Sequence, residues 1–179
     1  MSYCRHCAKL SADDPNVAYH DTEYGFPQTD DAVLFERLVL EIMQAGLSWS
    51  LILRKRPAFQ AAFDGFCIEK VAAYDETKIA QLLDNAAIIR NRLKIRAVIF
   101  NANVLLQLQQ EYGSFHNWLN AHHPRDLAAW LKLFKSRFRF VGGEIVREFL
   151  TSTGYLDDAH DTDCPIAARI AHLPERTHN

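Results

Sequence analysis

The sequence predicts an all-α protein. Its apolar residues recur mostly at three- and four-residue spacing, which is the period of helices that bury one face. No alternating run of apolar and polar residues is long enough to require a strand. Glycine and proline are scarce, with 7 and 6 residues, and no internal repeat or low-complexity linker interrupts the chain. The 179 residues therefore fit one domain, or two closely packed lobes, with a substantial core.

The expected helices begin and end at recognisable caps. Thr29, Asp30 and Asp31 offer caps for a helix over residues 32 to about 47, and Pro57 suits the first turn of the next helix. Asp75 is a cap for a short helix that ends near residue 83. The later helices are expected at residues 94 to about 112, which stops at Gly113; 115–121, capped by Ser114; 125–134, after Pro124; and 144–153, which stops at Gly154.

Composition narrows the class of protein. The chain is 49% hydrophobic and 23% charged, as in ordinary globular proteins, and it has no apolar run of membrane-spanning length. Its N-terminus lacks the apolar stretch of a secretory signal. With four cysteines and no export signal, we expect a cytoplasmic protein whose cysteines are metal ligands or buried thiols. Nothing in the sequence requires more than a monomer.

Basic residues cluster locally although the net charge is −2. Residues 85–92 (Asn-Ala-Ala-Ile-Ile-Arg-Asn-Arg) join two expected helices through a short basic turn, which suggests a helix-hairpin-helix over about residues 79–99. Arg90, Arg92 and Lys94 would then contact DNA phosphates. Because the glycines typical of such a turn are missing, an ordinary helical connection is an equal alternative. Basic runs at 54–56 and 132–139 are, by default, solvated helix faces.

Four residues near the two ends of the chain have the side chains that zinc prefers. They are Cys7, His20, His160 and Cys164, and two thiolates with two imidazoles can close a tetrahedral structural site. Such a site would join the N-terminal segment to the C-terminal one. Cys4 forms a CxxC with Cys7 and is a competing ligand, but the spacing to His20 favours Cys7.

A carboxylate in an apolar helix is the main candidate for chemistry. Glu41 lies in a stretch that is apolar on nearly all sides, so the helix is expected to be buried and the charge is costly without a partner or a task. A glutamate satisfied by arginine or by backbone is the alternative. Trp49, Tyr19 and Tyr24 supply aromatic rings that could grip a flat, cationic ligand beside it. Core packing is the alternative for that aromatic set.

These motifs together resemble the 3-methyladenine DNA glycosylase I family. The resemblance rests on Cys7 and His20, on the runs at 19–25 (Tyr-His-Asp-Thr-Glu-Tyr-Gly), 44–49 (Gln-Ala-Gly-Leu-Ser-Trp) and 87–95, on 138–142 (Phe-Arg-Phe-Val-Gly), and on His160 and Cys164. It extends in order over roughly residues 4–165. It implies a two-lobed helix-hairpin-helix glycosylase fold over residues 1–165, closed by a structural Zn²⁺, and leaves residues 166–179 as a tail without an assigned role.

The same resemblance implies base-excision repair of double-stranded DNA, by hydrolysis of the N-glycosidic bond of 3-methyladenine. Glu41 would be the catalytic and base-selecting residue, and Tyr19, Trp49 and Tyr24 would bind the base, with Tyr19 and Trp49 as a sandwich. Family members often carry tryptophan where this chain has Tyr24 and an aromatic residue where it has Asn16. Residues 95–110 contain no acidic residue, and no nucleophilic lysine is evident, so strand cleavage is not expected.

Two alternatives of other classes remain. A non-catalytic binding module could keep the scaffold, although it would not need Glu41 and Trp49. A redox protein could use the CxxC of Cys4 and Cys7, although the expected βαβ context is missing.

Overall fold

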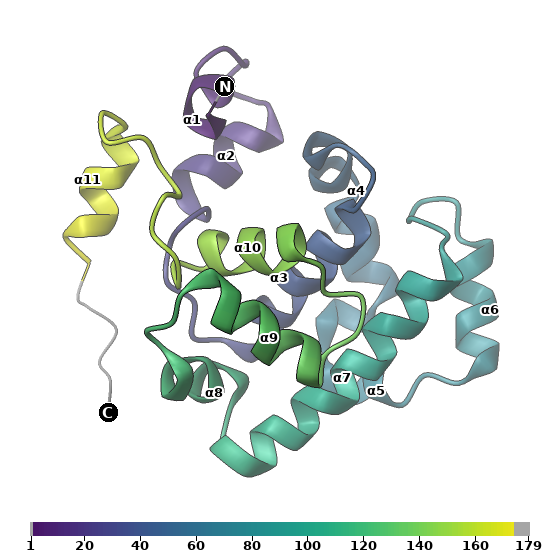
Figure 1. Cartoon of the computed structure of the whole chain (residues 1–179). Helices are drawn as coiled ribbons and strands as arrows, with labels where there is room; N and C mark the ends of the chain where they lie inside the picture. Colours follow the sequence, from purple (N-terminus) through teal and green to yellow (C-terminus); the bar gives the residue numbers. More distant parts are fainter. Residues whose placement is uncertain (1, 174–179) are drawn as a thin grey trace.

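The computed structural model describes residues 2–173 and confirms the all-α prediction, with no strand in that range. Figure 1 shows the arrangement of the helices. In chain order they are α1 (Tyr3–Cys7), α2 (Pro15–Thr22), α3 (Asp31–Gln44), α4 (Trp49–Ala62), the 3₁₀ turn η1 (Asp64–Phe66), α5 (Ile68–Ala72), α6 (Glu76–Asp84), α7 (Arg92–Tyr112), α8 (Phe115–His122), α9 (Leu127–Arg137), α10 (Gly143–Ser152) and α11 (Pro165–Ala171).

The predicted caps begin and end several of these helices. The Asp30 carboxylate accepts the backbone N–H groups of Ala32 and Val33 at 2.8 and 3.1 Å, so α3 starts at Asp31. Asp75 and Ser114 cap α6 and α8 in the same way. Gly113 ends α7 with a φ of 85°, a left-handed conformation that glycine adopts without strain.

The prediction for Pro57 is wrong. Pro57 lies inside α4 instead of in its first turn, because Ser48 begins that helix earlier by accepting the N–H of Leu51. A proline has no N–H to give to the carbonyl four residues back, so α4 lacks one internal hydrogen bond at this place.

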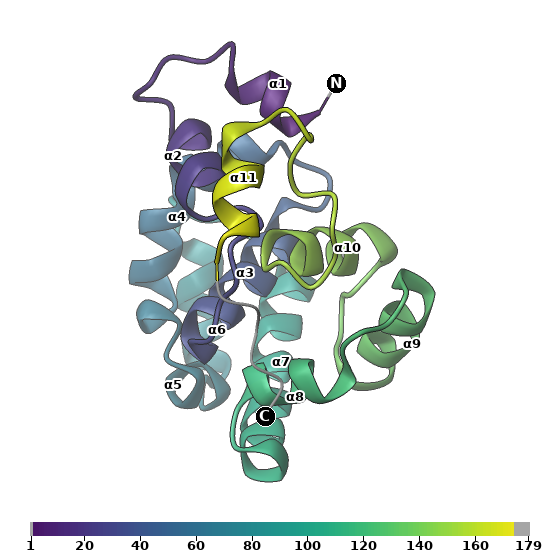
Figure 2. The same ribbon diagram turned by 90° about the vertical axis from the view of Figure 1, so that its left-hand side faces the viewer.

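Helix α3 forms the centre of the molecule. Every residue from Leu34 to Met43 is buried, and α4, α7, α8 and α10 pack around it. Figures 1 and 2 show α10 and α9 covering one side while α4 to α7 occupy the other. The sequence expectation of a helix buried on all sides is therefore met, and Glu41 is carried into the core with it.

The two ends of the described chain lie together. Helices α1, α2 and α11 are neighbours in both views (Figures 1 and 2), and Arg169 of α11 donates to the carbonyl oxygen of Asp21 at 3.1 Å. Helix α11 falls in the segment that the sequence left without a role, and it buries Ile166. Residues 174–179 of that segment lie outside the described residues.

Helices α6 and α7 pack as a pair joined by residues 85–91. Lys55 of α4 donates to the carbonyl oxygen of Ala87 at 2.8 Å, so this turn is fixed against the neighbouring helix. Within residues 2–173, none of the helices combines the length and apolarity that crossing a bilayer needs.

Candidate active site

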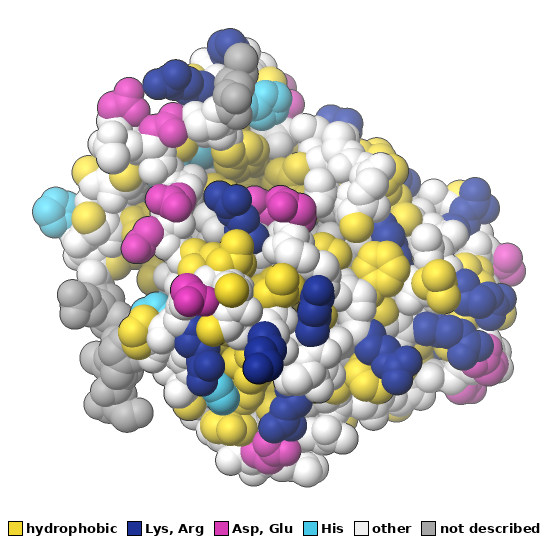
Figure 3. Space-filling model, in the orientation of Figure 1, with side chains coloured by type: hydrophobic (Ala, Val, Ile, Leu, Met, Phe, Trp, Pro, Cys, Tyr) yellow, Lys and Arg dark blue, Asp and Glu magenta, His cyan; other side chains and the backbone are white. Residues whose placement is uncertain are grey.

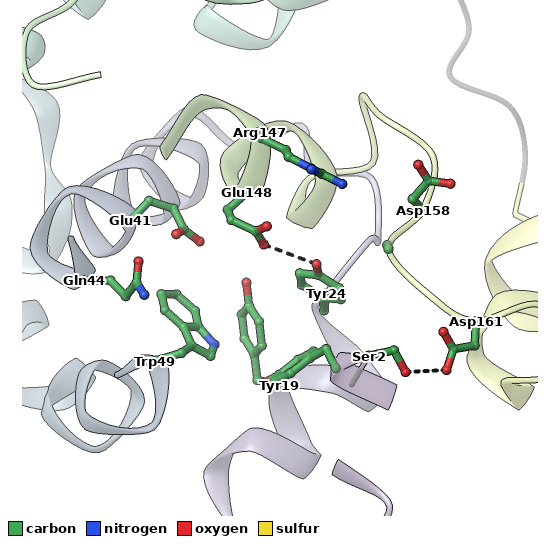
Figure 4. Close-up of a pocket in the computed structure, with 12 residues that line it drawn as sticks. Ser2, Tyr19, Tyr24, Glu41, Gln44, Trp49, Arg147, Glu148, Asp158 and Asp161 are labelled. Carbon is green, nitrogen blue, oxygen red and sulfur yellow. Dashed lines mark hydrogen bonds between the residues drawn. The ribbon is translucent and has the colours of Figure 1, made fainter. Parts of the chain in front are cut away.

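One cavity of about 500 Å³ brings together the aromatic and acidic residues that the sequence singled out. Glu41 from α3, Trp49 from the start of α4, Tyr19 from α2 and Tyr24 from the turn after it all line this cavity (Figure 4). That these four bind a base stays a prediction. Figure 3 shows the hollow among apolar side chains above α10, with both acidic and basic residues near its rim. The remaining lining residues are Ser2, Tyr3, Gln44, Arg147, Glu148, Asp158, Ala159 and Asp161.

Glu41 is the most deeply placed acid of the cavity, with 5% of its surface exposed. Burial, as the larger cause, and the negative charge of Glu148 together raise the pKa of its carboxyl group to about 8, and the positive charge of Arg37 partly opposes them. Arg37 does not form an ion pair with Glu41. Its Nη2 donates to Glu23 instead, and its guanidinium lies 4.5 Å from the centre of the Tyr19 ring. The Glu41 carboxyl group is therefore mostly protonated at pH 7.

The aromatic walls meet at an angle. The ring centroids of Tyr19 and Trp49 are 5.2 Å apart and their planes are inclined by 59°, while Tyr19 and Tyr24 are 5.9 Å apart and inclined by 47°. The predicted sandwich of Tyr19 and Trp49 is thus not what the structure has. A sandwich needs two parallel rings with room for a third between them, whereas these rings are inclined and contact each other. A base would lie against them as against two sides of a corner.

The hydroxyl of Tyr19 is a further polar group at this corner. It is buried without a hydrogen-bond partner of good geometry among residues 2–173. Burial raises its pKa above the ordinary value, so it is a neutral donor at every physiological pH. Such a buried, unsatisfied group is costly in a folded protein unless a ligand completes it.

Lys94 does not reach the surface, which corrects the prediction that it contacts DNA. Its Nζ donates to the carbonyl oxygens of Met43 and Ala45 at 2.9 and 2.7 Å, and only 5% of the residue is exposed. Burial lowers its pKa. The physical reason is that the last carbonyls of α3 have no intrahelical partner, and a cation from α7 satisfies them.

Arg90 and Arg92 are exposed at the start of α7, as the hairpin prediction requires. Arg92 lies 3.9 Å from Glu76 of α6, an exposed pair that contributes little to stability. Their contact with DNA stays a prediction. In the basic run at 54–56, by contrast, Arg56 is engaged inside the protein, by Glu23 at 2.7 Å and Glu36 at 2.8 Å.

A second group of ligand-type side chains lies behind the aromatic wall. The thiols of Cys4 and Cys164 and the imidazoles of His20 and His160 have one ligand atom each within 4.8 Å of one another, so the group could hold a metal ion. His160 Nδ1 is 3.2 Å from His20 Nε2, and Cys4 Sγ is 3.5 Å from His160 Nδ1. Cys164 Sγ lies 3.8 Å from each of the same two nitrogens.

The prediction that Cys7 belongs to this group is corrected, because the structure places Cys4 there. Helix α1 directs Cys7 toward α2 instead, and its thiol donates to the carbonyl oxygen of Asn16 at 3.6 Å. The other three predicted ligands are in the group. Sequence spacing to His20 could not distinguish two cysteines that are one helical turn apart.

The ligand atoms are oriented by neighbouring groups. His20 Nδ1 lies 2.6 Å from the Asp21 carboxylate and His160 Nε2 lies 2.8 Å from the carbonyl oxygen of Tyr24, which leaves the other ring nitrogen of each facing the group. The backbone N–H of Asp161 donates to Cys4 Sγ at 3.3 Å. Because His20 follows Tyr19 and His160 holds Tyr24, the ligand group positions two walls of the cavity.

Sequence reasoning missed several members of the cavity, among them Tyr3 and Glu148. Tyr3 packs edge-on against Tyr24, with centroids 5.1 Å apart, and its hydroxyl donates to Asn16 Oδ1 at 3.2 Å. Asn16 is buried below it and also donates to Ser50 at 3.0 Å, so it supports the wall from behind. Glu148 of α10 accepts the Tyr24 hydroxyl at 3.3 Å. A tyrosine so near the start and a glutamate in an amphipathic helix carried no distinguishing signal.

The fold is shared with known DNA repair enzymes. A solved structure of 3-methyladenine DNA glycosylase I from Staphylococcus aureus aligns with a TM-score of 0.81 and 32% identity over 92% of this chain and 97% of that chain. A tyrosine-to-phenylalanine variant of 3-methyladenine DNA glycosylase I, in complex with 3-methyladenine, aligns with a TM-score of 0.80 and 32% identity over 89% of this chain and 96% of that chain. The fold is thus that of a DNA glycosylase.

Sequence comparison identifies the family. The family model described as methyladenine glycosylase matches residues 9–129. DNA-3-methyladenine glycosylase 1 of Escherichia coli is 37% identical over 177 residues, which covers 88% of this chain and 94% of that protein. DNA-3-methyladenine glycosylase of Haemophilus influenzae is 34% identical over 168 residues, with 83% and 90% covered. The chain belongs to the methyladenine glycosylase family, as the sequence motifs predicted.

Proposed function

We propose that the enzyme removes 3-methyladenine from DNA by hydrolysing its N-glycosidic bond, the first step of base-excision repair. Its family and the names of its relatives support this activity. The observation that carries the proposal for the site is the placement of the buried Glu41 carboxyl group in a cavity walled by Tyr19, Tyr24 and Trp49. That cavity suits a flat ring that carries positive charge and N–H groups.

The chemistry follows from the lesion. Adenine alkylated at N3 is positively charged while attached to deoxyribose, so it leaves readily and needs little acid catalysis. The base is turned out of the duplex, and a weakly paired base costs least to extrude. The faces of Tyr19 and Trp49 would attract its charge. Glu41, ionised by the arrival of a cation, would accept N–H groups of the base edge and discriminate against neutral adenine.

Water is the expected acceptor of the sugar. Residues 95–110, which follow the hairpin, contain no acidic residue that would activate it. Lys94 lies near the segment that joins α3 to Trp49, but its Nζ donates to two backbone carbonyl oxygens and so is not a free nucleophile. Both features support a monofunctional hydrolase that does not cleave the strand.

Double-stranded DNA would bind across the hairpin of α6 and α7. Arg90 and Arg92 are exposed at the start of α7, where phosphates meet both their charge and the helix N-terminus. The enzyme would act as a monomer, since all the groups named here come from one chain.

The ligand group would hold a structural Zn²⁺ through Cys4, His20, His160 and Cys164. With Zn–N and Zn–S bonds of about 2.0–2.3 Å, a tetrahedron separates two nitrogens by about 3.3 Å and a nitrogen from a sulfur by about 3.6 Å. The distance of 3.2 Å between the two imidazole nitrogens, and the sulfur-to-nitrogen distances of 3.5–3.8 Å, fit this geometry. Bound zinc would have four protein ligands and so would stabilise the fold without activating water. Thiolate ligands also fit the cytoplasmic location proposed here.

The test is release of free base from methylated duplex DNA, separated by chromatography, with Glu41→Gln as the matched variant. Glutamine keeps the shape and removes the charge, so kcat/KM should fall at least about tenfold, the effect of one charge contact in a partly buried site. Equal metal content and a melting temperature no lower than that of wild type would show that the variant is folded. Normal kcat/KM in the variant would remove Glu41 from the mechanism, and binding without release by wild type would favour the non-catalytic module.

A further inference from the structure

A second carboxylate faces the same cavity as Glu41. Glu148 lies on α10, which packs against α3, and Figure 4 shows its side chain beside that of Glu41, where both line the same cavity. Its Oε2 accepts the hydroxyl of Tyr24 at 3.3 Å. Side chains of two different helices therefore bring two acids to one partly buried volume, where their charges repel.

We propose that Glu148 is a second base-selecting residue, which favours positively charged N-alkylated bases over neutral ones and fixes the orientation of Tyr24. The inference rests on the proposed function and concerns the substrate class of that site. Tyr24 is held at both ends, because its carbonyl oxygen accepts from His160 and its hydroxyl donates to Glu148.

The charges around Glu41 and Glu148 explain why these two acids would prefer a cationic base to a neutral one. Arg37 is bound to Glu23, and Arg147 lies exposed on the same helix as Glu148. With both acids ionised the cavity has excess negative charge, which a cationic ring offsets and a neutral ring does not. The charged and titratable groups facing the pair are Arg37 from α3, Tyr19 from α2, Tyr24 from the turn after α2, Tyr3 from α1, Arg147 from α10, and Asp158 and Asp161 at the rim. Glu144, one turn before Glu148 on α10, is exposed and does not line the cavity, and its charge is only a minor cause of the raised pKa of Glu148.

Burial raises the pKa of Glu148, and the hydrogen bond from Tyr24 opposes that effect. The charge of Glu148 in turn is one cause of the raised pKa of Glu41. The two acids are therefore coupled, and a cation that enters the cavity favours ionisation of both.

The test compares Glu148→Gln with Glu144→Gln, which removes the same charge from an exposed residue one turn away on α10. The probes are 3,9-dimethyladeninium, a permanent cation, and 9-methyladenine, its neutral counterpart. Calorimetric titration at pH 9 keeps Glu41 ionised in every variant. Loss of one charge near a cation in a partly hydrated site should weaken binding of the cation about tenfold. The neutral probe should bind Glu148→Gln as it binds wild type, and Glu144→Gln should bind both probes normally.

Two further readouts exclude a merely structural role. Glu148→Asp, which keeps the charge, should restore most of the preference for the cation. The acidic limb of the kcat/KM profile should move to lower pH in Glu148→Gln, because removal of a like charge lets Glu41 ionise more easily. An unchanged cation-to-neutral ratio in Glu148→Gln would overturn this inference, while base release by wild type would leave the proposed function standing. Failure of wild type to release 3-methyladenine would count against the function itself.

Discussion

Substitution of Cys4 and substitution of Cys7 should have opposite effects on metal binding. In the structure only Cys4 of this pair lies with His20, His160 and Cys164, whereas the thiol of Cys7 faces the Asn16 carbonyl. Cys4→Ala should therefore lose the metal ion, and Cys7→Ala should keep one equivalent. Both variants remove one thiol from the same short helix, so each controls for the other.

The stability effect follows from the length of chain that the site closes. Cys4 and His160 are 156 positions apart. Closing a loop of that size removes about 5 kcal/mol of conformational entropy from the unfolded chain, when treated as a cross-link. For a chain of this length, about 2–4 °C of melting temperature corresponds to 1 kcal/mol. Cys4→Ala should thus melt about 10–20 °C lower than wild type, and Cys7→Ala, which removes one small buried group, only about 2–4 °C lower.

The assay is metal content by mass spectrometry together with melting curves, before and after a strong chelator. Wild type and Cys7→Ala should both lose stability on chelation, whereas Cys4→Ala should not respond. A metal-free Cys7→Ala beside a metal-loaded Cys4→Ala would refute the reasoning and restore the ligand set that the sequence spacing favoured.

Three further expectations concern charges in and around the site. Lys94→Met leaves the last carbonyls of α3 without a donor, so unfolding should become easier by about 2 kcal/mol, or about 4–8 °C in a melting curve. The pKa of Glu41 is about 8 in the folded protein, above its value of about 4.3 in an unfolded chain, so wild-type stability should fall as pH rises between these values. Glu41→Gln should therefore melt higher than wild type at pH 8.5 and near wild type at pH 5; a constant difference at both would contradict the shift. Arg90→Ala and Arg92→Ala should each weaken DNA binding and reduce its salt slope by about 0.9 for each phosphate that is no longer neutralised, and an unchanged slope would remove the hairpin from the DNA surface.

Local features of the chain were the most predictable. Asp30, Asp75, Ser114 and Gly113 mark helix ends through hydrogen bonds or backbone conformations that depend only on nearby residues, and all four are where the sequence expected them. Burial of α3 also follows from its composition alone. Pro57 shows the limit, because the Ser48 cap determined where α4 begins and the proline was accommodated inside it.

Packing between distant segments was less predictable because periodicity gives the face of a residue but not its neighbour. Lys94 has the appearance of a surface charge next to Arg92, yet the rotation of α7 turns it toward the end of α3. Glu148 next to Arg147 has the appearance of a solvated pair, and only the packing of α10 on α3 shows that it faces Glu41. Motif resemblance supplied Tyr19, Glu41 and Trp49 because those residues lie in runs distinctive enough to recognise.

The ligand group and the cavity form one unit, which explains why residues at both ends of the chain matter for a site at its centre. His160 is near the C-terminus, yet its Nε2 holds the carbonyl oxygen of Tyr24, whose hydroxyl then reaches Glu148. On the other side, His20 follows Tyr19 in α2, so a metal ion that fixes the His20 imidazole would also fix the neighbouring Tyr19 ring. Lys94 provides the corresponding restraint at the end of α3, just before the loop to Trp49. The corner that would receive the base is therefore restrained on three sides by groups that never touch it, as a preorganised site requires.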